Sequence, residues 1–297
     1  MRIVGTVAAL RSALEQYRRQ GHSIALVPTM GALHEGHLSL MRHARAHSDA
    51  VVVSLFVNPS QFNERLDLDR YPRSEERDAE LATAAGADVL FAPSVEQVYP
   101  RGFATAVEVV GLTEPLEGAA RGAAHFRGVT TVVTKLLCMA MPEVAYFGQK
   151  DAQQVVVIRR LVADLNLPVR IEALPTVREP DGLAMSSRNG LLSASERRRA
   201  SAIPTALAAA SERAAAGERA AGVLVDSAAA LMRALGVEPE YVALVDPDTL
   251  EPLETLAGAG LLLLAARIGE VRLIDNVVLE PNMSSDLRQP LPGKAVA

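Results

Sequence analysis

The sequence predicts an α/β fold: a Rossmann-like, doubly wound parallel sheet, followed by a smaller α+β domain with a three-stranded antiparallel sheet. Early in the chain, short continuous apolar runs alternate with amphipathic segments of helical period, which is typical of a parallel sheet covered on both faces. Further along, two helical segments precede three apolar runs, which favours a separate antiparallel unit. The length of 297 residues suits two domains, which we place at residues 1–176 and 177–283, with a mobile tail at 284–297.

Each element follows from its local period. Helices are expected at residues 6–21, 35–49, 74–88, 129–142 and 151–168, and strands at residues 23–28, 50–57, 89–94, 143–149 and 169–177. Residues 176–190 are rich in polar residues, Gly and Pro, which predicts a linker or a functional loop. A helical region at 194–217 and a second helix ending near Leu235 follow, and then strands at 240–246, 261–268 and 271–279. Gly269 and Glu270 suit a type II′ hairpin turn between the last two strands.

Composition excludes several classes of function. The formal net charge of -5 and the lack of a basic stripe argue against a nucleic-acid partner. The longest apolar stretch is far shorter than the roughly 20 residues of a membrane helix, and the start of the chain lacks a signal-peptide pattern. We therefore expect a cytoplasmic protein with no membrane role. The single cysteine, Cys138, lies in an apolar helical segment, where we expect it to pack as a small hydrophobe.

The stretch PTMGALHEGHLSL, at residues 28–40, carries the strongest chemical signal. It follows a predicted strand and opens a predicted helix, so backbone N–H groups and the helix dipole there favour an anion. His34 and His37 would project from one face of the first helical turn and donate hydrogen bonds to phosphate oxygens. The alternatives are surface or capping histidines, or a metal pair, although zinc would need a third ligand.

Other polar residues fall at the same edge of the predicted sheet. Gln61 follows the strand at 50–57, and its neutral amide suits a hydroxy acid, although a polar turn held by Pro59 would also explain it. Lys150 follows the strand at 143–149 as a candidate phosphate ligand, and Asp151 is a candidate N-cap. An ordinary solvated lysine is the alternative. The run ERRR at 196–199 is expected to be a solvated helix face.

Four blocks together carry a family resemblance. HEGH at residues 34–37 resembles the HxGH signature of the nucleotidyltransferase superfamily. PTMGALHEGH, SLFVNPSQF, YFGQKDAQQ and GLAMSSRN, in this order and spacing, resemble the pantothenate synthetases, also called pantoate-beta-alanine ligases. One departure is Gln149, which stands where many relatives have Glu. Since Lys150 is retained, we expect this change to be tolerated.

The resemblance implies a site, substrates and an assembly. It implies an ATP site formed by Met30, Gly31, Ala32, Leu33, His34, Glu35, Gly36, His37, Gly148, Gln149, Lys150, Asp151, Val177, Met185, Ser186, Ser187 and Arg188. It also implies that Gln61 contacts both pantoate and beta-alanine, that Gln154 binds pantoate, and that the protein is a homodimer. The activity implied is an AMP-forming ligase that makes a C–N bond in pantothenate biosynthesis.

The implied chemistry is adenylation of pantoate by ATP, with loss of pyrophosphate, followed by attack of the beta-alanine amine and loss of AMP. A carboxylate is already ionised at neutral pH, so positioning and charge neutralisation are the main tasks. We assign His34, His37, Lys150 and Arg188 to the phosphates as the catalytic set. Mg²⁺ would be held mainly by phosphates and water, so no protein metal ligand is named. For the amine step no dedicated base is evident.

Two rivals to the ligase activity exist. Another HxGH nucleotidyltransferase acting on a phosphorylated substrate would need Arg or Lys where SLFVNPSQF and YFGQKDAQQ offer neutral Gln. A non-catalytic nucleotide sensor would have been indicated by loss of His37 or Lys150, and both are present. The connector around Met185–Arg188 and the second domain would act as a lid that keeps water from the adenylate.

Overall fold

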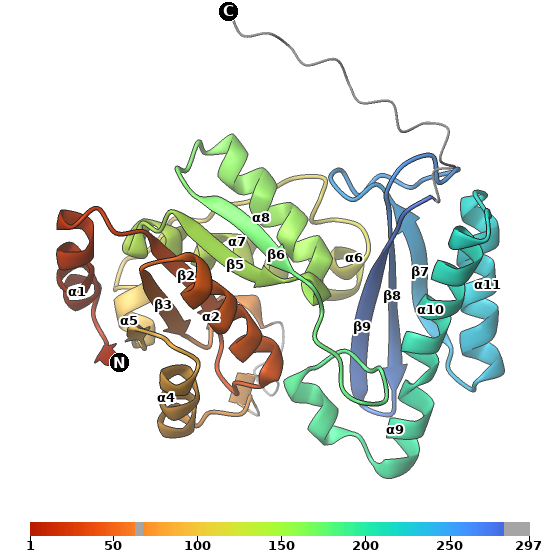
Figure 1. The fold of residues 1–297 in the computed structure, drawn as a ribbon, viewed down its shortest axis with the longest axis horizontal. Coiled ribbons are helices and arrows are strands. Elements are labelled where there is room, and N and C mark those ends of the chain that lie inside the picture. Colours follow the sequence, from red (N-terminus) through yellow and green to blue (C-terminus); the bar gives the residue numbers. More distant parts are fainter. Residues whose placement is uncertain (63–67, 70, 282–297) are drawn as a thin grey trace, which may run out of the picture.

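The computed structural model describes residues 1–62, 68, 69 and 71–281. It contains a six-stranded sheet flanked by helices and, beside it, a three-stranded sheet, as Figure 1 shows. All pairings in the larger sheet are parallel and those in the smaller sheet are antiparallel. The predicted fold class is therefore confirmed.

The larger sheet has the order β1-β4-β3-β2-β5-β6. Its strands are β1 (Arg2–Val4), β2 (Ile24–Thr29), β3 (Ala50–Leu55), β4 (Val89–Phe91), β5 (Val144–Gly148) and β6 (Arg170–Leu174). The helices of this part are α1 (Val7–Arg19), α2 (Glu35–His47), α4 (Glu75–Ala84), α5 (Val95–Val98), α6 (Glu117–Arg121), α7 (Ala123–Ala140) and α8 (Ala152–Asp164). Two 3-10 turns, η1 (Pro59–Gln61) and η2 (Gln149–Asp151), follow β3 and β5.

Alternate side chains of the central strands enter two separate cores, as the pleat requires. In β2, Ile24 and Leu26 pack with residues of α1, α7 and α8 on one face. Ala25 and Val27 pack with residues of α2 and α4 on the other face. All four are buried, which explains why the strand has a continuous apolar sequence.

The smaller sheet consists of β7 (Pro239–Val245), β8 (Gly260–Ile268) and β9 (Val271–Leu279), and it is preceded by η3 (Ser187–Leu191), α9 (Ala194–Ala200), α10 (Ala202–Ala215) and α11 (Ala221–Ala234). Leu262 and Leu264 of β8 pack with α10 and α11. Leu261 and Leu263 face the other way and pack with Val156 of α8. The smaller sheet is therefore in apolar contact with α8, which flanks the larger sheet.

Several element predictions need correction. Strand β1 was not predicted, because three residues at a sheet edge carry too little pattern. The helix predicted from residue 129 begins at Ala123, and the helical region at 194–217 is divided between α9 and α10. Cys138 is exposed rather than packed, because it lies on the outer face of α7. The tail predicted at 284–297 lies outside the described residues, and the domain boundary at 176 remains a prediction.

Candidate active site

The predicted ATP-binding segments meet where the strand order reverses. β2 and β5 are neighbours in the sheet, although β3 and β4 extend from β2 on its opposite side. Leu26 pairs with Ala145, so the carboxyl ends of the two strands, at Thr29 and Gly148, lie level. Ligands of open parallel sheets bind at such a switch point. The segments at 30–37 and 148–151 are thus brought together as expected.

The rings of His34 and His37 each accept a backbone hydrogen bond at the start of α2. His34 is the N-cap, and its Nδ1 accepts a hydrogen bond from the N–H of Gly36 (3.2 Å). The backbone N–H of His34 donates to Nδ1 of His37 (3.4 Å), and the centroids of the two rings lie 4.1 Å apart. A neutral imidazole that accepts at Nδ1 carries its proton on Nε2. Both rings therefore present an Nε2–H donor.

The surroundings keep both rings neutral. Burial lowers the pKa of His34 from 6.5, and the nearby charge of Lys150 lowers it further. Burial, followed by His34, lowers the pKa of His37 to about 3. The predicted capping role and the predicted phosphate role are compatible, because capping uses Nδ1 and leaves Nε2–H available.

Asp78 of α4, which the sequence did not single out, supports the loop before α2. Its carboxylate accepts hydrogen bonds from the N–H groups of Ala32 (2.9 Å) and Leu33 (2.8 Å), and the residue is 2% exposed. Ala32 has a φ of 52°, which is uncommon for a residue other than glycine. At Gly31 a Cβ would lie 2.9 Å from Asp78 Oδ2. The carboxylate therefore holds the loop in its unusual conformation.

The connector lies against the HEGH turn. A Cβ built on Gly36 would stand 2.9 Å from His34 Cε1 and 3.8 Å from Cβ of Met185. Glycine is needed there because any side chain would displace the His34 ring. Met185 donates its N–H to the carbonyl of Val177 (2.9 Å), so these two predicted residues are neighbours.

The rest of the connector is also ordered by hydrogen bonds. The Ser186 hydroxyl caps η3 by accepting from the N–H of Arg188 (3.3 Å). The Ser187 side chain is hydrogen-bonded to Tyr71. Burial raises the pKa of Tyr71 above 10.0, and the nearby Arg188 charge offsets part of this rise. Arg178 makes a bidentate ion pair with buried Asp275 of β9 (2.6 and 3.1 Å).

The ERRR prediction is wrong for one residue. Arg197 donates hydrogen bonds to Glu179 (2.6 Å) and Asp181 (2.6 Å) of the connector. These hydrogen bonds raise its pKa and lower those of both carboxyl groups. Arg197 therefore anchors the connector to α9 instead of being solvated.

The second predicted segment is fixed by the smaller sheet. Asn276 of β9 donates through Nδ2 to the carbonyls of Gln149 (2.9 Å) and Lys150 (3.0 Å). The Gln149 amide donates to Asn276 Oδ1 (3.4 Å), so this side chain takes part in the same contact. Asp151 occupies the N-cap of α8, as predicted, but makes no capping hydrogen bond; its carboxylate lies 3.7 Å from Lys150 Nζ.

Gln61 lies beside the end of β2. Its Nε2 donates to the sulfur of Met30 (3.0 Å), and its Oε1 accepts from Asn58 Nδ2 (3.0 Å). Asn58 is buried and also contacts Ser60 and Tyr99, so it braces η1. Unexpectedly, Nδ1 of His125 lies 2.7 Å from the carbonyl oxygen of Gln61.

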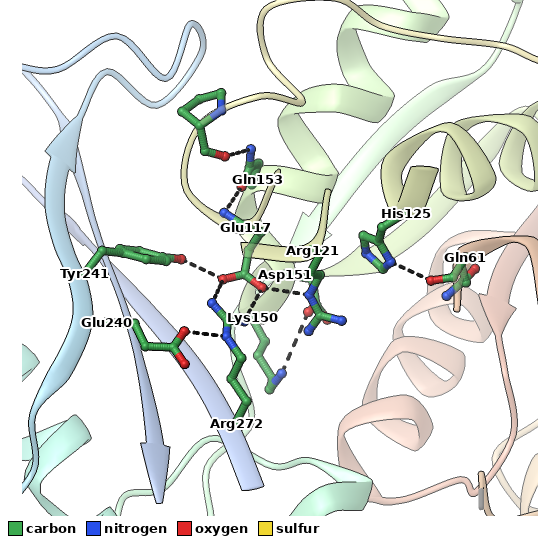
Figure 2. Close-up of polar contacts among 11 residues, drawn as sticks. Gln61, Glu117, Arg121, His125, Lys150, Asp151, Gln153, Glu240, Tyr241 and Arg272 are labelled. Atoms are coloured by element: carbon green, nitrogen blue, oxygen red, sulfur yellow. Dashed lines mark hydrogen bonds and ion pairs between the residues drawn. The ribbon is translucent and has the colours of Figure 1, made fainter. Parts of the chain in front are cut away.

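A buried carboxylate on α6 joins the region of the larger sheet to the smaller sheet near this site. Glu117 accepts two hydrogen bonds from Arg272 of β9 (2.6 and 2.8 Å), one from Tyr241 of β7 (2.9 Å) and one from Arg121 (2.9 Å). Figure 2 shows that Arg121 lies between this cluster and His125. The Gln153 side chain accepts a hydrogen bond from the backbone N–H of Glu117 and so helps to position this carboxylate.

The remaining predicted residues lie at the edges of this arrangement. Gln154, in the first turn of α8, is half-buried. Glu35 is exposed and paired with Arg42. A separate groove of about 960 Å³, lined in part by Leu112, Arg160 and Val225, contains none of the predicted residues. Whether the predicted residues bind ligands stays a prediction.

The described residues include neither a metal-ligand cluster nor a membrane-spanning helix. Among them, no group of three or more His, Cys, Asp or Glu side chains could hold a metal ion. Likewise, none of the helices among the described residues has the length and apolar character needed to span a membrane.

Comparisons with known proteins agree with this arrangement. The family model described as pantoate-beta-alanine ligase matches residues 2–278. A pantothenate synthetase of Moorella thermoacetica is 54% identical over 286 residues, which are 95% of this chain and 100% of that protein.

Solved structures give the same result. The pantothenate synthetase of Thermus thermophilus has a TM-score of 0.89 and 47% identity, covering 95% of this chain and 100% of that one. The pantoate-beta-alanine ligase of Francisella tularensis, solved in complex with beta-gamma ATP and beta-alanine, has a TM-score of 0.78 and 34% identity, covering 94% and 97% of the two chains. The present chain therefore belongs to the pantoate-beta-alanine ligase family of enzymes.

Proposed function

We propose that the chain condenses (R)-pantoate with beta-alanine to pantothenate through a pantoyl adenylate, releasing pyrophosphate and then AMP. The observation that carries the proposal is the pair of Nε2–H donors on His34 and His37, held beside Lys150 at the switch point of the sheet. Neutral donors and a lysine suit the phosphates of ATP, and the family membership supplies the substrates.

In the first step the pantoate carboxylate attacks the α-phosphorus of ATP, and pyrophosphate leaves. His34, His37, Lys150 and Arg188 stabilise the negative charge on the phosphates. Because burial and the neighbouring His34 lower the pKa of His37 and favour its neutral ring, we assign it a hydrogen bond to the departing group rather than a proton transfer. Gln61 and Gln154 would hold the acid, with neutral amides that suit its hydroxyl and carboxylate.

Mg²⁺ fits this site only as an ion held mainly by phosphates and water. The described residues offer the half-exposed carboxylate of Asp151 beside Lys150, but no cluster of three ligands. When bound, it would neutralise phosphate charge. The connector at 177–190 and the smaller domain would enclose the adenylate as a lid. We further propose that the protein acts as a cytoplasmic homodimer.

Pyrophosphate release tests the proposed function. The purified protein is mixed with ATP, Mg²⁺ and pantoate, first without and then with beta-alanine. We expect a burst approaching one pyrophosphate per site without the amine, and steady AMP formation when the amine is added. No release under either condition would contradict the proposal. Release with other acids but not with pantoate would favour another HxGH nucleotidyltransferase.

A further inference from the structure

Three histidines lie at this site, and their hydrogen bonds divide them into two types. His34 and His37 accept backbone N–H groups at Nδ1, so each carries its proton on Nε2. His125 is different, because its Nδ1 lies 2.7 Å from a carbonyl oxygen, that of Gln61, which can only accept. Nδ1 of His125 must therefore carry the proton, and in the neutral ring Nε2 presents a lone pair.

The position of His125 is fixed by close packing of α7 on η1. A Cβ at Gly128 would lie 2.3 Å from the carbonyl oxygen of Ser60 and 2.7 Å from the nitrogen of Gln61, so only glycine allows this approach. Asn58 Nδ2 also donates to the Gly128 carbonyl (3.1 Å). His125 is one helical turn earlier on α7 and is half-buried beside Gln61 (Figure 2).

The surroundings of His125, taken together, favour the neutral ring. Burial is the main cause that lowers its pKa below 6.5, and Arg121 of α6 lowers it further. The hydrogen bond to Gln61, Glu117 of α6 and Asp151 of η2 oppose this shift. At neutral pH the imidazole is therefore able to accept a proton.

The second half of the reaction needs such a group. The beta-alanine amine has a pKa near that of lysine, about 10, so it arrives as an ammonium ion that cannot attack a carbonyl. We propose that Nε2 of His125 is the base that takes this proton. The inference rests on the proposed function, in which Gln61 contacts both acids.

The bonds and protons balance as follows. The ammonium nitrogen transfers one proton to Nε2 of His125, and its lone pair then forms a bond to the acyl carbon. The bond between the acyl carbon and the phosphate oxygen breaks, and AMP leaves. The second proton on nitrogen passes to the departing phosphate. His125, now an imidazolium with Nδ1–H still bonded to Gln61, releases its proton to water.

Single-turnover kinetics on the whole enzyme tests the assignment. The adenylate is formed with ATP, Mg²⁺ and pantoate, and is then mixed with beta-alanine from about pH 6 to about pH 9. His125→Asn keeps a donor where Nδ1 stands but removes Nε2. We expect the wild-type rate of amide formation to level off above the His125 pKa. In the variant we expect a rate about a hundredfold lower at neutral pH, rising about tenfold per pH unit.

Two controls separate this role from a structural one. Pantoate-dependent exchange of pyrophosphate into ATP reports only the first step, and it should change by no more than a few fold in His125→Asn. Hydroxylamine, which is largely unprotonated at neutral pH, should react with the adenylate almost equally well in both enzymes. His47→Asn is the matched control, because His47 makes the same kind of bond to a carbonyl (2.8 Å) on an exposed part of α2.

Each contrary outcome is distinct. A level pH profile or a wild-type amide rate in His125→Asn would overturn the assignment, as would equal loss of exchange and amide formation. Absence of pantoate-dependent exchange in the wild-type enzyme would instead contradict the proposed function itself.

Discussion

At His37, a substitution by Asn can separate the two hydrogen-bonding roles of the ring. In His37→Asn the side-chain oxygen can still accept the N–H of His34, as Nδ1 does, but the Nε2–H donor is lost. We expect the rate of pantoate-dependent pyrophosphate exchange to fall about a hundredfold to a thousandfold, the usual effect of losing one donor to developing charge. Exchange within a few fold of wild type would show that His37 does not contact the phosphates.

The sequence predicted which side chains lie at the ligand edge, but it did not predict the protonation state of the histidines. His34, His37 and Lys150 stand at ends of apolar runs, so sequence alone placed them at the ligand edge. The neutral state of the histidines depends on burial and on the approach of Lys150, which come from the packed structure. The same holds for His125, which had no distinguishing pattern in the sequence.

At the scale of elements, α4 supports the loop that leads into α2. Asp78→Asn leaves one acceptor where the carboxylate has two, so an amide NH₂ would face a backbone N–H. The loop should then shift, and a small displacement can cost about a hundredfold in rate. We expect slower pyrophosphate exchange together with faster hydrogen exchange of residues 31–34.

Asp88→Asn is the matched control for this prediction. Asp88 also accepts a hydrogen bond from a backbone N–H, that of Val51 (2.8 Å). It directly precedes β4, however, and so lies at the amino ends of the strands, away from the ligand edge. Similar losses of activity in both variants would mean that Asp78 acts only through general stability.

The element pattern itself was largely readable from the sequence. β2, β3 and β5 are long apolar runs with a clear period, whereas β1 has three residues and needs its pairing with β4 to exist as a strand. The break between α9 and α10 at Ser201 comes just before Pro204, which has no backbone N–H to donate to the carbonyl of Ala200. The apolar period runs through this point and does not show the break.

At the scale of the whole molecule, Glu117 connects α6 to β7 and β9 of the smaller sheet. Glu117→Gln would leave the Arg272 guanidinium, which is 13% exposed, without its main partner. Removing one partner of a buried pair costs about 3 to 5 kcal/mol, so we expect the free energy of unfolding in denaturant to fall by about that amount. Glu238→Gln, in the exposed pair with Arg233, should cost less than about 1 kcal/mol. Equal effects would contradict the assigned role.

The Glu117 pair also predicts a pH dependence. Burial alone would raise the pKa of Glu117, but hydrogen bonds from Arg272 and its charge, with Arg121, lower it to about 2 from 4.5. A carboxyl group with a lowered pKa contributes stability above its unfolded value and loses that contribution as pH falls. Wild-type stability should therefore decrease from about pH 4.5 to about pH 2, and the Glu117→Gln profile should be flatter there.

The sequence by itself determined the fold class, the ligand edge of the sheet and the HEGH turn, because periodicity and strand-to-helix junctions are properties of neighbouring residues. Only the tertiary structure decided the support of the loop by Asp78, the tautomer of His125 and the connection through Glu117. These contacts join residues 46, 64 and 155 positions apart, respectively. Protonation and hydrogen-bond direction depend on such partners and on burial, which exist only once the chain has packed.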